Sequence, residues 1–218
     1  MIKGAILDMD GVLVDSLAIW EDLRVRYLCR HGIVPEKKIG DVLFSMSLEE
    51  GCAYVKKLYG LRESVSDIRC GMEELLRQYY REEAQAYPGA KELLELFRVS
   101  GIPMVLATST PRELAESALE RLGFLPFFRR VLIASEFEGG KRSPAVFLAG
   151  AAILGTAPEE TLVFEDSLYA LETAGRAGFR TVGVYAPDGE PDQAGLKAKS
   201  ELYLDALTEF TSISITDK

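Results

Sequence analysis

Histidine is almost absent from this chain of 218 residues, which contains only His31. This residue stands directly before Gly32, where we expect a helix to end. A basic side chain followed by glycine is a common signal for the end of a helix. We therefore expect a structural role for His31, and reaction mechanisms that need a histidine base are disfavoured.

Cysteine is also scarce. The three cysteines, Cys29, Cys52 and Cys70, are widely spaced, and no two of them form a Cys-x-x-Cys motif. An odd count at wide spacing argues against a disulfide framework and against a zinc site. We therefore expect all three to be small apolar residues within helices.

Two further absences concern membranes and nucleic acids. No apolar run approaches the roughly 18 residues that a membrane-spanning helix needs, and residues 1–3 lead into the first expected strand without a signal-peptide pattern. Acidic residues outnumber basic ones, 34 to 25, for a net charge of −9, which makes nucleic acid and anionic membranes unfavourable partners. We expect a cytoplasmic protein. The sequence leaves the oligomeric state open, a monomer included.

The most informative stretch is Ala5–Ser16. We expect Ala5–Leu7 to be a buried strand of a parallel sheet, with Asp8 and Asp10 at its carboxyl end, where open parallel sheets bind ligands. Gly11 allows a sharp turn there. Crowded carboxylates are unfavourable unless a cation lies between them or one is protonated, and such oxygen ligands suit Mg²⁺ beside a phosphate. The alternative is a solvated acidic loop after a strand.

The rest of the chain divides into a helical part and an alternating part. Helical periodicity extends from residue 16 to residue 84, and strands and helices alternate beyond Tyr87–Ala90, which predicts a parallel sheet covered on both faces. We therefore expect an α/β fold, with a Rossmann-like core of residues 1–15 and 85–218 and an all-helical insertion of residues 16–84. An insertion at the carboxyl end of a strand is placed to act as a lid.

The boundaries of the expected elements follow from the same periodicity. In the insertion we expect one helix with Trp20, Leu23, Tyr27, Leu28 and His31 on one face, a second from Ser47 to Gly60 and a third from Ser66 to Ala86. The later strands are expected at 103–107, 131–133, 161–164 and 180–184, and the later helices at 90–100, 111–123, 144–154 and 168–177. Residues 202–207 fit either a strand or a helix.

Three later positions carry polar side chains just past an expected strand or in a turn before a helix. Thr108 and Ser109 offer hydroxyl and backbone N–H groups for an anion, although simple helix capping is the alternative. Lys141 lies in a glycine-rich turn, where a solvated loop lysine is the alternative. Glu165 and Asp166 repeat the acidic pair of the first strand, with helix capping again as the alternative.

These positions together resemble the four motifs of the haloacid dehalogenase-like superfamily, in its β-phosphoglucomutase-like and phosphatase branch with a helical cap. The first motif is matched by residues 8–12, the second by Thr108, and the fourth by residues 165–166. The third is matched by Lys141 with Pro144 and Phe147 at the usual spacing. This chain departs from the third motif at Arg142, where proline is usual, and at Ala145, where an acid is common. Arg142 would add a second cation near the phosphate.

The resemblance implies a mechanism with two aspartates. Asp8 would attack the phosphorus and form an aspartyl phosphate. Asp10 would be the general acid and base, protonated when the leaving group departs. The phosphoryl oxygens would be bound by four residues. These are Gly11, Thr108, Ser109 and Lys141.

The resemblance also implies a magnesium ion. Asp8 and Asp166 would hold Mg²⁺ together with a backbone carbonyl near Asp10, and Glu165 would be a second carboxylate ligand or an outer partner. The lid would then exclude water and select the leaving group. We expect the selecting residues within the insertion. The candidates are Trp20, Arg24, Ser45, Met46, Tyr54 and Arg77.

We therefore expect a Mg²⁺-dependent phosphatase that acts on a small phosphorylated metabolite, a sugar or nucleotide phosphate. The alternatives are a sugar phosphomutase and a non-catalytic protein that binds a phosphorylated metabolite. In the mutases a cap histidine and an arginine-containing loop assist, whereas this chain has Trp20 and Ser45–Ser47 in those places, which favours the phosphatase. The intact pair of Asp8 and Asp10 argues against a binding role alone.

Overall fold

The computed structural model describes residues 1–35 and 48–210. Contacts divide the chain into two compact units, one of Met1–Ser16 with Ala84–Lys218 and one of Leu17–Glu83. Among the described residues, no helix combines the length and the apolar character that crossing a bilayer requires.

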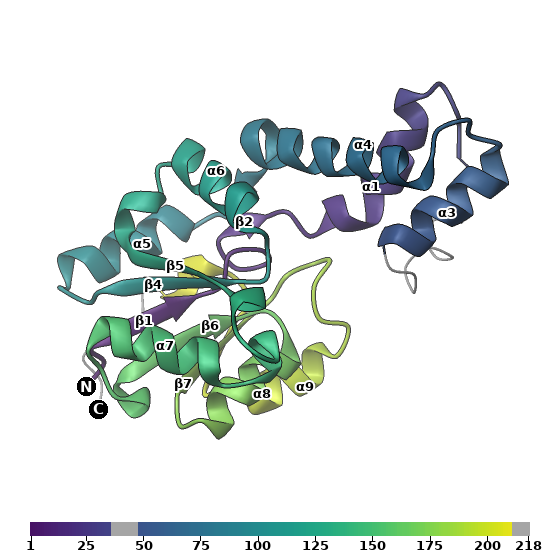
Figure 1. Ribbon diagram of the computed structural model, residues 1–218. Helices are drawn as coiled ribbons and strands as arrows, with labels where there is room; N and C mark the ends of the chain where they lie inside the picture. Colours follow the sequence, from purple (N-terminus) through teal and green to yellow (C-terminus); the bar gives the residue numbers. More distant parts are fainter. Residues whose placement is uncertain (36–47, 211–218) are drawn as a thin grey trace. The chain divides into compact units, whose positions relative to one another are not determined.

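A six-stranded sheet is the centre of the larger unit, and every pair of neighbouring strands in it is parallel (Figure 1). The strand order is β5-β4-β1-β6-β7-β8. The bounds are β1 (Gly4–Leu7), β4 (Met104–Thr108), β5 (Phe128–Ile133), β6 (Thr161–Glu165), β7 (Arg180–Val184) and β8 (Leu202–Leu204). This sheet, together with the helical insertion described below, confirms the expected α/β fold.

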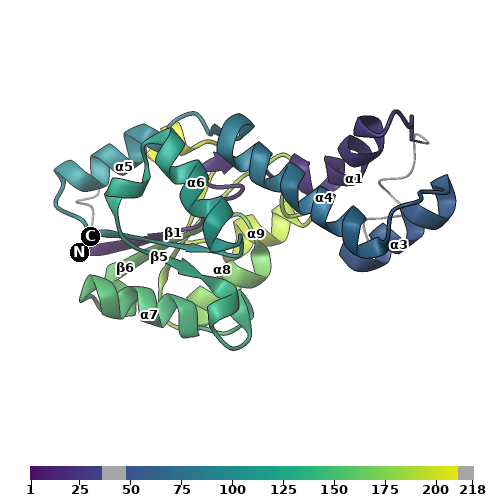
Figure 2. The same cartoon turned by 45° about the horizontal axis from the view of Figure 1, so that its top comes forward.

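Helices cover both faces of this sheet. The views of Figures 1 and 2 agree that α5 and α6 lie on one face and α7 and α8 on the other. The bounds of the helices are α5 (Ala90–Val99), α6 (Arg112–Leu122), α7 (Ala145–Leu154), α8 (Leu168–Arg176), α9 (Gln193–Lys199) and α10 (Leu207–Phe210). Short 3₁₀ turns join them, namely η2 (Leu125–Phe127), η3 (Ala134–Glu136), η4 (Gly140–Arg142) and η5 (Pro158–Glu160).

The two faces of the sheet have separate apolar cores, as the alternation of side chains along a strand requires. On one face, Ile6 of β1 belongs to a buried cluster with Phe147 of α7. On the other, the ring of Phe164 from β6 lies 5.9 Å from Phe97 of α5 and 5.1 Å from Phe210 of α10. These fully buried layers hold β1 rigidly in the middle of the unit.

The chain order creates a switch point beside β1. From β1 the chain builds β4 and β5 on one side, and it then builds β6, β7 and β8 on the other side. Ligands of open α/β sheets bind at the carboxyl ends of the strands at such a point. The residues that follow β1 and β6 therefore meet where a ligand site is expected.

A small antiparallel pair joins the segments that flank the insertion. Strand β2 (Val14–Asp15) pairs with β3 (Gln85–Ala86). The prediction that the third helix of the insertion extends to Ala86 is therefore wrong at its end. The backbone of residues 85–86 finds its partner in β2, and two residues are too short a strand to leave a periodic signal.

All regular secondary structure among the described residues of the smaller unit is helical. The unit contains α1 (Ala18–Arg30), α3 (Leu48–Tyr59), α4 (Val65–Gln78) and a π-helical turn, η1 (Tyr79–Glu83). A reciprocal capping box between Ser64 and Asp67 begins α4, which satisfies free N–H groups at the start of that helix. The expected helix start at Ser47 lies outside the described residues.

The expected face of α1 is buried in part. Leu23, Tyr27 and Leu28 are buried as expected, whereas Trp20 is 40% exposed and His31 is also exposed. The buried stripe begins at Ile19, which was not predicted. The stripe follows a spacing of four residues from Ile19, which turns Trp20 about 100° away from it. His31 lies at the C-terminal end of α1, as expected.

All three cysteines lie in helices, as expected. Cys52 is buried, whereas Cys29 and Cys70 are exposed. The segment at 202–207, which was left open between a strand and a helix, contains both, β8 followed by the start of α10. The short helix α9 was not predicted.

Close packing of α7 on the sheet gives a prediction at Gly150. A β-carbon added there would lie 2.7 Å from Ile6 Cδ1, within a fully buried core. We expect Gly150→Val to lower the free energy of unfolding by about 1–3 kcal/mol through overpacking, measured by urea denaturation. The control is Ala152→Val on the exposed side of the same helix, which is expected to cost only about 0.5 kcal/mol in helix propensity. Equal losses in both variants would contradict the tight contact.

Candidate active site

The turn after β1 brings the first acidic pair to the carboxyl edge of the sheet. The N–H of Asp8 donates to the carbonyl of Phe164 in β6 at 3.1 Å, which ties the end of β1 to its neighbour. Gly11 then adopts a φ of +78°, a conformation that favours glycine. Both Asp8 and Asp10 are buried, with 7% and 9% of their surface exposed. A solvated acidic loop is therefore excluded.

A buried lysine links two of the site carboxylates. The ammonium Nζ of Lys141 lies 2.7 Å from Asp8 Oδ1 and 2.7 Å from Glu165 Oε1. Lys141 lies within η4, next to Gly139 and Gly140, which both have positive φ. Because the lysine is only 4% exposed, a solvated loop lysine is excluded as well.

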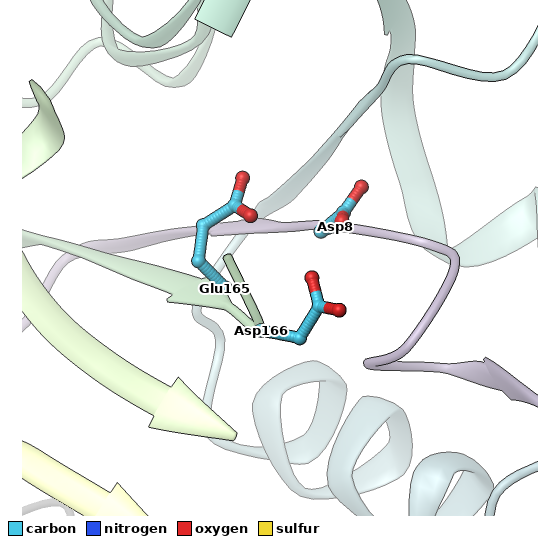
Figure 3. A group of neighbouring side chains, drawn as sticks. All are labelled: Asp8, Glu165 and Asp166. Atoms are coloured by element: carbon cyan, nitrogen blue, oxygen red, sulfur yellow. The ribbon is translucent and has the colours of Figure 1, made fainter. Parts of the chain in front are cut away.

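The three acids at this edge form a group that fits a divalent cation. Asp8, Glu165 and Asp166 each offer a carboxylate oxygen, and these oxygens lie within 4.8 Å of one another (Figure 3). Glu165 Oε2 is buried and has no hydrogen-bond partner among the described residues. An all-oxygen set of this kind with an unsatisfied buried oxygen matches the ligand preference of Mg²⁺.

Burial controls the protonation of these acids. It is the largest influence on the pKa of Asp8 and of Glu165, and it raises both, although Lys141 acts in the opposite direction. Burial, followed by the charge of Asp8, raises the pKa of Asp166 to about 7. Burial alone would lower the pKa of Lys141, but the adjacent carboxylates of Asp8 and Glu165 outweigh it and raise that pKa. The lysine therefore stays charged, and the three acids are the groups that a proton or a further cation would neutralise.

Asp10 has a different environment, made of hydroxyl groups. The Thr110 hydroxyl donates to Asp10 Oδ2 at 2.7 Å, and the Ser16 hydroxyl donates to Asp10 Oδ1. The Thr108 hydroxyl also lies 3.4 Å from Oδ2. Asp10 is thus oriented by hydrogen bonds and is set apart from the ion-paired carboxylates.

Ser16 and Thr110 were not among the predicted site residues. Both stand next to predicted motifs, since Thr110 is two residues after Thr108 and Ser16 ends the first acidic stretch. The run of hydroxyl residues at the end of β4 could have pointed to Thr110, and the Asp15–Ser16 end of the first acidic stretch could have pointed to Ser16. Their contacts with Asp10 depend on the turn geometry, which the sequence pattern does not specify.

The remaining predicted residues are placed as follows. Thr108 is fully buried at the end of β4 and accepts a hydrogen bond from the N–H of Thr110 at 3.0 Å. Ser109 is exposed. Glu165 is the last residue of β6, not the first residue after it, and Asp166 follows. Arg142 is exposed and stacks over the ring of Tyr169, 4.4 Å from its centroid.

The raised pKa values predict how stability depends on pH. An acid whose pKa rises on folding binds its proton more tightly in the folded state than in the unfolded state. For Asp166 the pKa rises from 3.8 to about 7. Its contribution to the free energy of unfolding is therefore present at low pH and is lost as the pH rises from about 4 to about 7. In a chelator, we expect the free energy of unfolding to fall by on the order of 2–4 kcal/mol across this window. Urea denaturation at several pH values measures this fall.

Asp166→Asn removes the titrating group and should flatten this fall, whereas Asp205→Asn, at an exposed aspartate, should not. A fall of the same size in the Asp166 variant would contradict the assignment. Added Mg²⁺ should stabilise the wild-type protein more above pH 7 than below it, because the carboxylates are then ionised.

Comparison with known proteins adds an independent result. A family of haloacid dehalogenase-like hydrolases matches residues 2–178. The phosphorylated carbohydrates phosphatase of Thermotoga maritima is 26% identical over 181 residues, which are 83% of this chain and 84% of that protein. Hexitol phosphatase A of Escherichia coli K12 is 30% identical over 191 residues, which are 87% of this chain and 86% of that protein.

A solved structure agrees with the same assignment. The crystal structure of a "putative beta-phosphoglucomutase" from Thermotoga maritima superposes with a TM-score of 0.86 and 25% identity, covering 97% of this chain and 100% of that one. The resemblance drawn from the four motifs is thereby confirmed. This chain belongs to the haloacid dehalogenase-like hydrolases, in the β-phosphoglucomutase-like and phosphatase branch with a helical insertion.

Proposed function

We propose that this protein is a Mg²⁺-dependent phosphatase that hydrolyses a small phosphorylated carbohydrate through an aspartyl-phosphate intermediate. We further propose that it acts in the cytoplasm, as its composition leads us to expect. The observation that carries the reaction is the buried group of Asp8, Lys141, Glu165 and Asp166 at the carboxyl edge of the sheet. The substrate class is supported by the names of the two relatives, which specify phosphorylated carbohydrates and a hexitol.

In this proposal, Asp8 is the nucleophile. One of its oxygens forms a bond to phosphorus while the bond from phosphorus to the leaving oxygen breaks. Lys141 touches Asp8, so its ammonium is close enough to pair with a phosphoryl oxygen as charge develops there. Asp8, Asp166 and Glu165 would hold the Mg²⁺, which supplies positive charge that offsets the repulsion between carboxylate and phosphate.

Asp10 carries the proton transfers. It donates a proton to the leaving alkoxide oxygen, and it then accepts a proton from the water that hydrolyses the aspartyl phosphate. The hydroxyls of Ser16 and Thr110 fix the orientation of its carboxyl group. The Thr108 hydroxyl accepts a hydrogen bond from the N–H of Thr110. We expect Thr108 to help bind the phosphoryl oxygens, together with the backbone of Gly11 and Ser109.

The helical insertion is proposed to select the leaving group. Of the six candidate residues, Arg24 is buried inside the helical unit, Tyr54 is half-buried, and Arg77 pairs with Glu74. Ser45 and Met46 lie outside the described residues. Trp20, in the place of the mutase histidine, favours hydrolysis over transfer to a second hydroxyl, and a phosphomutase is the alternative outcome of the assay.

The nucleophile gives the first activity prediction. Asp8→Asn should lower kcat by at least about 10³-fold on sugar phosphates and on p-nitrophenyl phosphate, because the amide is a poor nucleophile. Phosphate release is measured with and without Mg²⁺ over a panel of hexose and hexitol phosphates. Asp205→Asn, the same change at an exposed aspartate of the same unit, is the control and should keep wild-type activity.

Two results of this assay would oppose the proposal. Phosphate release that persists in Asp8→Asn would exclude Asp8 as the nucleophile. A wild-type protein that releases no phosphate, but interconverts sugar monophosphates when a bisphosphate is added, would be a phosphomutase. If the protein bound sugar phosphates but catalysed neither reaction, it would be a non-catalytic protein that binds a phosphorylated metabolite.

The hydroxyl shell of Asp10 gives the second activity prediction. Thr110→Val keeps the shape of the side chain but removes the hydrogen bond to Asp10, so we expect kcat on a hexose phosphate to fall about tenfold. The loss should be smaller on p-nitrophenyl phosphate, whose leaving group needs less protonation. Thr110→Ser retains the hydroxyl and should keep most of the activity. An equal loss on both substrates would contradict a role in orienting the acid.

A further inference from the structure

The loop between β7 and α9, residues 185–192, matches no motif of the sequence but passes directly beside Asp166. A β-carbon added at Gly189 would lie 3.0 Å from Asp166 Oδ2 and 3.0 Å from Ala186 Cβ. Ala186 itself is buried, and the N–H of Gly189 donates to its carbonyl at 3.1 Å. The loop therefore closes tightly against the Asp166 carboxylate, and the absence of a side chain at Gly189 makes this approach possible.

Gly189 is needed for space and not for backbone conformation. Its φ lies outside the left-handed region in which the positive-φ glycines of this chain are found. An alanine could therefore adopt the backbone of residue 189 without strain in φ. What it could not do is keep the present distance to Asp166, because contacts of 3.0 Å to a β-carbon are shorter than van der Waals packing allows.

Glu190 connects this loop to α8, the helix that follows Asp166. Its Oε2 accepts a hydrogen bond from the N–H of Leu168, the first residue of α8, at 3.0 Å, and its Oε1 accepts one from Asp192 at 3.1 Å. Leu168 follows Asp166 by two residues. A carboxylate at a helix N-terminus is stabilised by the free N–H groups and by the helix dipole. Glu190 thus bridges the loop and the start of α8.

The other end of the loop is held as well. The Gln193 side-chain amide donates to the carbonyl of Glu190 at 2.7 Å, and its oxygen accepts from the Tyr203 hydroxyl of β8 at 2.9 Å. The other oxygen of the Asp166 carboxylate, Oδ1, accepts a hydrogen bond from the Ser167 hydroxyl at 3.2 Å. The carboxylate of Asp166 is therefore enclosed between the Ser167 hydroxyl and the backbone of the loop.

We propose that Gly189 and Glu190 are positioning residues of the metal site, which hold the Asp166 carboxylate in the orientation that binds a divalent cation. The hydrogen bond from Leu168 to Glu190 holds the loop against α8, and the backbone of Gly189 packs against Asp166 Oδ2. The proposal rests on the Mg²⁺ dependence of the proposed function. Its effect is on the affinity for the metal, since neither residue touches the reacting atoms.

The experiment measures binding of Mg²⁺ alone to the full chain by isothermal titration calorimetry, without substrate. We expect the Kd for Mg²⁺ to rise about tenfold in both variants, because Gly189→Ala displaces the Asp166 carboxylate and Glu190→Ala frees the loop beside it, and a disturbed outer shell of a metal ligand typically weakens binding at least tenfold. Gly175→Ala is the control, because a β-carbon there, on the exposed side of α8, would only reach an ordinary contact of 3.6 Å. The conservative variant Glu190→Gln keeps an acceptor for the N–H of Leu168 and should restore most of the affinity.

A purely structural role would give a different pattern. Gly189→Ala and Glu190→Ala would then lower the melting temperature of the metal-free protein while the Kd for Mg²⁺ stayed at its wild-type value, and this result would overturn the proposal. Equal weakening in Glu190→Gln and Glu190→Ala would overturn the anchoring role of the hydrogen bond. If the wild-type protein itself bound no Mg²⁺, the proposed function would fail in its metal dependence, and the positioning role would fail with it.

Discussion

The site depends on the two ion pairs that the Lys141 ammonium group makes with Asp8 and Glu165. The ammonium group lies between the carboxylates of Asp8 and Glu165 in a region almost closed to water. Carboxylates buried without a partner are strongly destabilising, and removal of one member of a buried ion pair commonly costs about 3–5 kcal/mol. One cation does not neutralise Asp8, Glu165 and Asp166 together. The charge that remains must be compensated either by protonation, which the raised pKa values of these acids favour, or by a second cation.

Rigid surroundings keep these carboxylates close together in spite of their mutual repulsion. Asp8 follows β1 and Glu165 ends β6, and the two strands are hydrogen-bonded neighbours in the middle of the sheet. Both strands are fully buried on each face by the cores around Phe147 and around Phe97. The carboxylates cannot move apart without breaking these layers, so the repulsion between them is relieved by ion pairing, by protonation or by metal binding.

The sequence was sufficient for the fold class and for most of the ion-paired site, and the reason is physical. Parallel strands end at one edge of a sheet, so acids placed at the ends of β1 and β6 must converge, as Asp8, Glu165 and Asp166 do. Lys141 lies in η4, further from a strand end, and it was assigned to the site only through the resemblance to the third motif. Contacts that depend on the course of a turn were not predictable. The hydrogen bonds of Ser16 and Thr110 to Asp10 and the bond from Leu168 to Glu190 belong to this class. The rotation of α1 that buries Ile19 and exposes Trp20 depends on packing within the helical unit.

The position of β1 has a consequence for how the chain is made. The first strand of this sheet to be synthesised, β1, pairs Ala5 with Met104 on one side and with Leu162 on the other. It therefore stays without a strand partner until about a hundred further residues have been synthesised, whereas the helical unit of Leu17–Glu83 makes its contacts over short sequence distances. Local contacts form sooner than distant ones. The insertion is thus expected to fold during translation before the sheet whose chain it interrupts.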